Sequence, residues 1–99
     1  MALNGINIPL AVTGFETILD SVLSQFGASN ASRADFFPGP AFLAWGRMGN
    51  LKTWGGPLPD YWLKGQLELQ KVILERMRSL GMKPVLPCFP GFVPQEVVS

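Results

Sequence analysis

The chain has 99 residues, with 8 basic and 7 acidic side chains, and 47% of its residues are hydrophobic. That hydrophobic content excludes an intrinsically disordered protein, which has few apolar residues and a large net charge. The net charge of +1 gives no electrostatic attraction to nucleic acid or to an anionic membrane surface. We therefore expect at most one small globular domain, with no nucleic-acid partner.

The residue types that are missing exclude further classes of protein. There is no histidine and Cys88 is the single cysteine, so a histidine-dependent catalytic triad, a histidine-ligated metal site and an internal disulfide are excluded. No run of 18 apolar residues is present, so we expect no membrane span. The first ten residues lack the basic region of a signal peptide.

The N-terminal quarter of the chain predicts a strand followed by a helix. Residues 5–12 are an apolar segment typical of a buried strand, although Pro9 counts against a central position because it cannot donate to a ladder. Residues 13–16, Thr-Gly-Phe-Glu, have the spacing of a capping box, in which the hydroxyl and the carboxylate bond to the backbone. Apolar residues recur at helical spacing over 15–26, and Gly27 is expected to end that helix.

The rest of the chain predicts a long loop, a long helix and a second strand. Residues 27–59 are rich in Gly and Pro, with a short helix expected near 31–37. A helix is predicted over 61–80 with Asp60 as its cap, and a strand over 83–89. The order strand–helix–long loop–helix–strand predicts an α/β protein, a βαβ unit that supplies part of a (β/α)8 TIM barrel.

One short motif in the loop concerns modification. Asn30-Ala31-Ser32 is a sequon for N-linked glycosylation, which matters only in a chain that enters the secretory pathway. Sequons of three residues also arise by chance. Either Ser29 or Asn30 is expected to cap the short helix that follows.

Candidate site residues gather at the expected carboxyl ends of the strands and in the long loop, where α/β proteins bind ligands. Glu16 is either a functional carboxylate or a member of the capping box, which already explains it. Trp45 either stacks on the apolar face of a sugar or belongs to the core of the loop. Arg47 either binds an anion or holds the loop through carbonyl groups. The residues expected to face one cleft are Thr13, Glu16, Trp45, Arg47, Asn50 and Trp54.

A carboxylate pair for glycoside hydrolysis is not evident. That reaction generally needs two carboxylates across the scissile bond. Glu16 is the acid at the strand ends, and a pair would need Asp35 or Asp60 to fold inward. The sequence therefore offers no convincing carboxylate pair for this reaction.

Residues 39–51, Gly-Pro-Ala-Phe-Leu-Ala-Trp-Gly-Arg-Met-Gly-Asn-Leu, resemble the signature of the α-N-acetylglucosaminidase family, the lysosomal glycoside hydrolases that degrade heparan sulfate. Residues 1–7, 53–54, 56–59, 77–82 and 84–87 resemble the family too, and the similarity covers nearly the whole chain. The resemblance implies a TIM-barrel catalytic domain that removes terminal α-linked N-acetylglucosamine with retention and without metal or organic cofactor. Both catalytic glutamates of the family lie outside the matched segments, so residues 1–99 are expected to be a fragment of that domain, inactive alone.

The resemblance also implies how the fragment contributes to its parent enzyme. Trp45 would contact the sugar, and Glu16, Arg47, Asn50 and Trp54 are expected to line the pocket. The partner would be the terminal N-acetylglucosamine of a glycan, and the parent would be lysosomal or secretory. The alternative is a catalytically inactive, truncated paralogue that acts as an interaction module.

Overall fold

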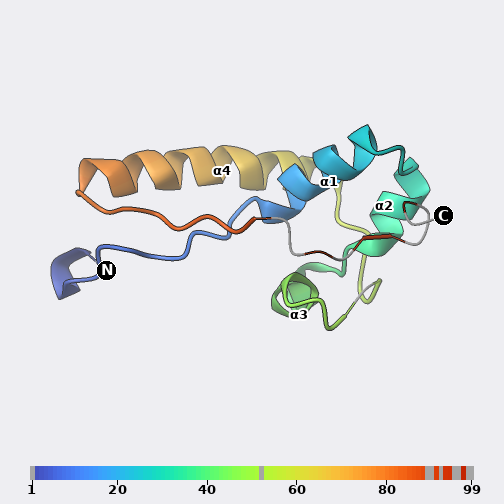
Figure 1. Ribbon diagram of the computed structural model, residues 1–99, viewed down its shortest axis with the longest axis horizontal. Helices are drawn as coiled ribbons and strands as arrows, with labels where there is room; N and C mark the ends of the chain where they lie inside the picture. Colours follow the sequence, from blue (N-terminus) through green and yellow to red (C-terminus); the bar gives the residue numbers. More distant parts are fainter. Residues whose placement is uncertain (1, 52, 89–90, 92, 95–96, 98–99) are drawn as a thin grey trace.

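The computed structural model describes residues 2–51, 53–88, 91, 93–94 and 97. The molecule is elongated, with extents of 46 × 24 × 24 Å, and α4 runs along much of its length while α3 projects from one side (Figure 1). The elements in chain order are η1 (Ala2–Asn4), α1 (Phe15–Gln25), α2 (Asn30–Phe36), η2 (Pro40–Phe42), α3 (Leu43–Arg47) and α4 (Asp60–Ser79).

Helix α1 forms where the apolar periodicity predicts it, but it begins without the expected capping box. Leu19 and Leu23, one turn apart, are buried, and Gly27 follows the helix with φ 90°. The residue before α1 is Gly14, and within the described part of the chain no side chain caps this helix. The capping-box prediction is therefore wrong, and the carboxylate of Glu16 has another partner, described below.

The main core lies where α1, α2 and the loop before α4 meet. Phe36 and Phe37 pack edge to face, with ring centroids 5.4 Å apart. The short helix α2 is confirmed, and Ser29 is its cap, since the Ser29 hydroxyl accepts from the backbone N–H of Ser32 at 3.2 Å. The buried residues of this cluster are Leu19, Leu23, Ala28, Phe36, Phe37 and Leu58.

Helix α4 matches the predicted long helix, with a shift of one residue at its start. Asp60 is its first residue and makes no side-chain capping bond, so its predicted role as cap is wrong. The helix buries Gln70 and Met77. Two apolar residues of this helix, Leu69 and Val72, are 46% and 63% exposed. In this chain the apolar face of α4 is thus only partly covered.

The two predicted strands lie side by side in parallel, but no named strand is present among the described residues. They share one isolated bridge, Leu10 with Val85, in which Val85 N–H donates to Pro9 O and Ala11 N–H to Val85 O, both at 2.8 Å. Lys83 N–H also donates to Asn7 O at 2.7 Å.

Prolines interrupt this parallel ladder on both sides of the bridge. The next bridge toward the N-terminus would need an N–H donor at Pro9. The next bridge toward the C-terminus would need an N–H donor at Pro87. Neither can form, because proline has no backbone N–H. The prediction of two strands is therefore corrected to two extended segments joined by a single bridge. In the described residues the two segments run parallel with α4 alongside (Figure 1), and this arrangement does not by itself establish the predicted partial barrel.

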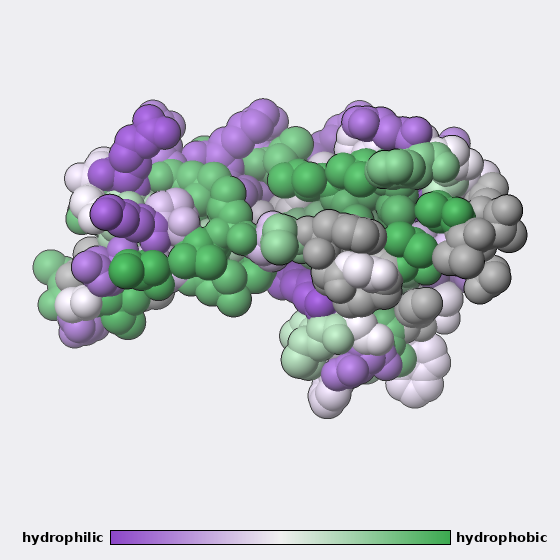
Figure 2. Space-filling view, viewed as in Figure 1, coloured by the Kyte–Doolittle hydropathy of each residue, from purple (hydrophilic) through white to green (hydrophobic). Residues whose placement is uncertain are grey.

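Large apolar side chains remain exposed along both extended segments. Ile8 and Leu10 are 60% and 66% exposed, and Leu86 is 55% exposed. Figure 2 shows apolar side chains over much of the face that carries the N-terminal segment and α4. The radius of gyration is 14.8 Å, above the roughly 13 Å of a compact chain of this length. The apolar content noted in the sequence is therefore only partly buried.

Candidate functional site

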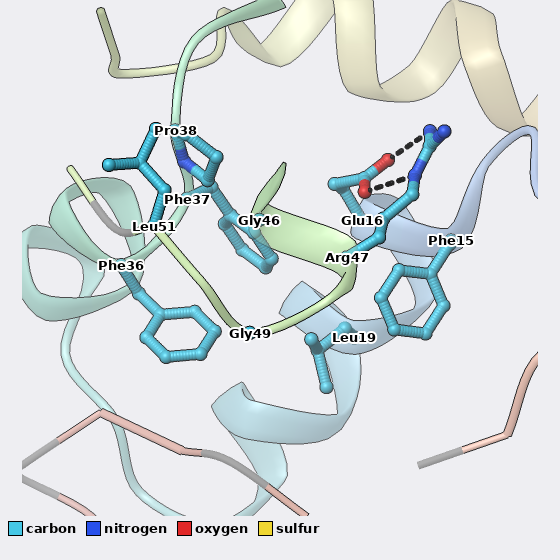
Figure 3. Close-up of a pocket in the computed structure, with 10 residues that line it drawn as sticks. All are labelled: Phe15, Glu16, Leu19, Phe36, Phe37, Pro38, Gly46, Arg47, Gly49 and Leu51. Carbon is cyan, nitrogen blue, oxygen red and sulfur yellow. Dashed lines mark hydrogen bonds and ion pairs between the residues drawn. The ribbon is translucent and has the colours of Figure 1, made fainter. Parts of the chain in front are cut away.

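The centre of the candidate site is an ion pair between α1 and α3. Arg47 Nε donates to Glu16 Oε2 at 2.8 Å and Arg47 Nη2 to Glu16 Oε1 at 2.9 Å (Figure 3). Glu16 is buried, whereas the Arg47 side chain is 24% exposed. This two-bond geometry is the strong, directional form of an arginine–carboxylate contact. Each carboxylate oxygen of Glu16 accepts a bond from Arg47, and the pair fixes α3 to the first turn of α1.

The cavity beside this pair is small. Its volume is about 10 Å³, room for about one water molecule and far too little for a sugar ring. In Figure 3 the apolar side chains gather around the loop that carries Arg47. The residues that line the cavity are Phe15, Glu16, Leu19, Phe36, Phe37, Pro38, Gly46, Arg47, Gly49 and Leu51.

Close backbone packing fixes the motif around α3. A Cβ on Gly46 would lie 2.5 Å from Cγ of Pro38, so only glycine fits between α3 and the preceding segment. The N–H of Gly39 donates to Trp54 O at 2.6 Å. The N–H of Asn50 donates to Trp45 O at 3.0 Å, which closes the turn after α3. The glycines of the motif thus permit close approach of the backbone and tight turns.

The remaining candidates lie outside that cavity. Trp45 is 54% exposed on α3 and Trp54 is 62% exposed, with its ring 5.5 Å from that of Phe42, edge to face. Asn50 is exposed. Thr13 lines a different, apolar groove. The structure therefore brings Glu16 and Arg47 together and does not form one cleft from all six candidates.

That apolar groove, of about 270 Å³, lies between α1, α4 and the extended segments, and Thr13, Leu67 and Leu86 are among its lining residues. Gln70, which is buried with 6% of its surface exposed, also lines this groove. Gln70 Nε2 donates to Ala11 O at 3.0 Å, the carbonyl that a bridge to the proline at position 87 would otherwise use. Gln70 Oε1 has no hydrogen-bond partner among the described residues.

Gln70 was missed by the sequence reasoning although a signal for it exists. It lies three residues after Leu67 and four before Leu74, which puts a polar side chain on the apolar stripe of α4. A polar residue in such a stripe is typical of a buried hydrogen bond.

The residues that the structure describes contain neither a membrane-spanning helix nor a cluster of metal-ligating side chains. No helix there is long and apolar enough to cross a membrane. Nor do three or more Cys, Asp or Glu side chains come together there as a metal site would require.

Comparison with known proteins identifies the family. Residues 1–99 match the model of the alpha-N-acetylglucosaminidase (NAGLU) TIM-barrel domain. The human alpha-N-acetylglucosaminidase is 58% identical over 97 residues, which are 98% of this chain and 13% of the human protein. The chain thus spans about an eighth of that relative.

Solved structures agree with the sequence comparison. A family 89 glycoside hydrolase from Clostridium perfringens in complex with 2-acetamido-1,2-dideoxynojirmycin is similar over 95% of this chain and 11% of its own, with 39% identity and a TM-score of 0.88. A variant from the same organism, in complex with its substrate GlcNAc-alpha-1,4-galactose, matches with the same values. With a family model that covers every residue and relatives in both sequence and structure, this chain belongs to the α-N-acetylglucosaminidase family.

Proposed function

We propose that this chain is a segment of the TIM barrel of a larger glycoside hydrolase that removes terminal α-linked N-acetylglucosamine from glycans such as heparan sulfate. Its part is to present Trp45 to the sugar, with Arg47, Asn50 and Trp54 in the same loop region. The parent enzyme is lysosomal or secretory, as the resemblance implies. The catalytic carboxylates come from outside these 99 residues.

The observation that carries this proposal is the exposure of Trp45 on a fixed support. Its indole is 54% exposed, although its helix is held by the Arg47–Glu16 pair and by the close packing of Gly46 on Pro38. A large aromatic ring that is held in place and open to solvent is suited to stacking on the apolar face of a sugar. The substrate complex of the bacterial relative, which contains GlcNAc-alpha-1,4-galactose, supports this ligand class.

The same geometry supports the absence of catalysis by the segment alone. A retaining glycosidase needs two carboxyl groups about 5–5.5 Å apart. The carboxylate of Glu16 accepts two bonds from Arg47, and the cavity beside it holds about 10 Å³. Glu16 therefore serves as the anchor of α3 and not as an acid or nucleophile.

The test is a chimera in which this chain replaces the matching 97 residues of the human relative. We expect hydrolysis of an aryl α-N-acetylglucosaminide by the chimera and none by the isolated chain. Trp45→Ala in the chimera should lower kcat/KM about tenfold or more, equivalent to about 1.4 kcal/mol of lost transition-state binding.

The matched control is Tyr61→Ala, which removes a 79% exposed aromatic ring from α4. It should change kcat/KM by less than about twofold, since surface substitutions are usually within about 0.5 kcal/mol. Turnover by the isolated chain above that of its own Trp45→Ala variant would contradict the proposal, as would an equal effect of both substitutions in the chimera.

A second candidate function, an interaction module in a truncated paralogue, is favoured by one observation. The apolar groove of about 270 Å³ is bordered by Leu86 and by Gln70, whose Oε1 has no hydrogen-bond partner in the part of the chain that the structure describes. Such a groove fits another polypeptide segment, either the rest of a barrel or a separate chain. Activity of the chimera would favour the rest of a barrel as the segment that fills this groove. A stable complex between an inactive chimera and a separate chain would favour the interaction module.

A further inference from the structure

We infer that Asn30 is an acceptor site for an N-linked glycan. The inference rests on the proposed lysosomal or secretory route of the parent enzyme. Asn30-Ala31-Ser32 is the one sequon in the 99 residues, and its middle residue is not proline. The sugar-binding function proposed above makes no use of this motif.

The position of the sequon gives access to the modifying enzyme. Asn30 is the first residue of α2 and follows the Ser29 cap, three residues after the turn that ends α1. Asn30 and Ala31 are exposed, and Ser32 is half-buried. Phe36, at the far end of α2, is the residue that this helix buries. In Figure 1 α2 lies at the opposite end of the molecule from the N-terminus.

The contacts of the Asn30 carboxamide leave the reactive nitrogen available. Arg33 Nη2 donates to Asn30 Oδ1 at 2.6 Å, while Arg33 Nε donates to Asp20 Oδ1 at 2.9 Å and Nη1 to Ala28 O at 2.6 Å. Arginine thus holds the oxygen side of the carboxamide. Among the described residues no hydrogen bond uses Asn30 Nδ2, so a sugar on that nitrogen preserves these contacts.

The reaction joins the carboxamide to a lipid diphosphate-linked oligosaccharide, the donor class of N-glycosylation. Asn30 Nδ2 forms a bond to the anomeric carbon and loses one proton. The bond from that carbon to the diphosphate oxygen breaks, and the lipid diphosphate leaves with the electron pair. Asn30 Oδ1 keeps its lone pairs and its bond from Arg33, so the turn between α1 and α2 does not need to rearrange.

The experiment expresses the full chain behind a cleavable secretion signal in a eukaryotic cell and measures the mobility of the whole pool before and after peptide N-glycosidase treatment. We expect a shift that the enzyme removes. Ser32→Ala should abolish it, because the sequon is lost while Asn30, Arg33 and the Ser29 cap remain. Ser32→Thr should keep it, because threonine completes the sequon.

A co-expressed secreted glycoprotein verifies that the cell attaches glycans. The inference is overturned if that glycoprotein is modified and the chain is not, or if Ser32→Ala keeps the shift. Glycan attachment is read on the isolated chain and hydrolysis on the chimera, so failure of the glycan site and failure of the proposed function give different results.

Discussion

At the scale of single residues, Glu16 shows why spacing alone misassigns a side chain. The capping box needs Glu16 to bond back to the backbone before its own helix, yet Gly14 opens that helix with φ 82° and no side-chain cap. A residue 31 positions away, Arg47, takes the carboxylate instead. No local pattern encodes a contact of that separation, so the sequence predicts both residues as site candidates but not as partners.

The pair predicts a measurable loss when its charge is removed. Glu16→Gln keeps the shape but leaves Arg47 without its counter-charge, and breaking a buried pair costs about 3–5 kcal/mol. Since the Arg47 side chain is 24% exposed, we expect the free energy of unfolding to fall by about 2 kcal/mol. Urea denaturation measures it.

The control for that measurement is Glu68→Gln. Glu68 accepts from Lys71 Nζ at 3.0 Å, but the two side chains are 70% and 63% exposed. Such a surface pair is worth less than about 1 kcal/mol. Equal losses from the two substitutions would show that the α1–α3 contact is no stronger than a surface pair.

At the scale of elements, helices are predictable here because their signals are local. Apolar periodicity and a following glycine locate α1 and α4 to within one or two residues, and a serine locates the start of α2. Apolar content alone predicts the two strands, and Pro9 counts against a central position for the first of them. The structure shows that two prolines, with no N–H to donate, limit the pairing to one bridge.

Restoring one donor should therefore lengthen the pairing. Pro9→Ala supplies an N–H that the parallel pattern directs at Lys83 O, which completes a second bridge. Amide hydrogen exchange should show the new amide at position 9 protected. Pro84→Ala is the control, since its N–H would point to the opposite edge from those of Lys83 and Val85. Equal exchange at the two introduced amides would contradict this account.

At the scale of the whole molecule, the chain leaves many large apolar side chains exposed, among them Ile8, Leu10 and Leu86. The segment paired with Val85 carries two of these side chains, with Ile8 60% and Leu10 66% exposed. Exposed apolar side chains that lie together are typical of surfaces that contact another chain. The composition indicates a high apolar content, 47% of the residues. It does not predict which of these side chains stay exposed, because that depends on how α4 packs against the extended segments.

We therefore expect the isolated chain to self-associate and Leu10→Lys to weaken that association. Burial of a leucine side chain is worth about 1.5–3 kcal/mol, so the dissociation constant from sedimentation should rise about tenfold or more. Leu3→Lys is the control, because Leu3 is fully exposed in η1 and away from the bridge. A chain that remains monomeric at all concentrations would refute this expectation.

The Arg47–Glu16 pair has one consequence for the family motif itself. The contact closes a ring of chain 31 residues long, and closing such a ring costs conformational entropy that grows with its length. A short peptide of residues 39–51 contains the sequence of the motif but lacks Glu16, the residue that holds α3 in place. The orientation of α3, and with it that of Trp45, therefore depends on a contact with α1 that lies outside the motif.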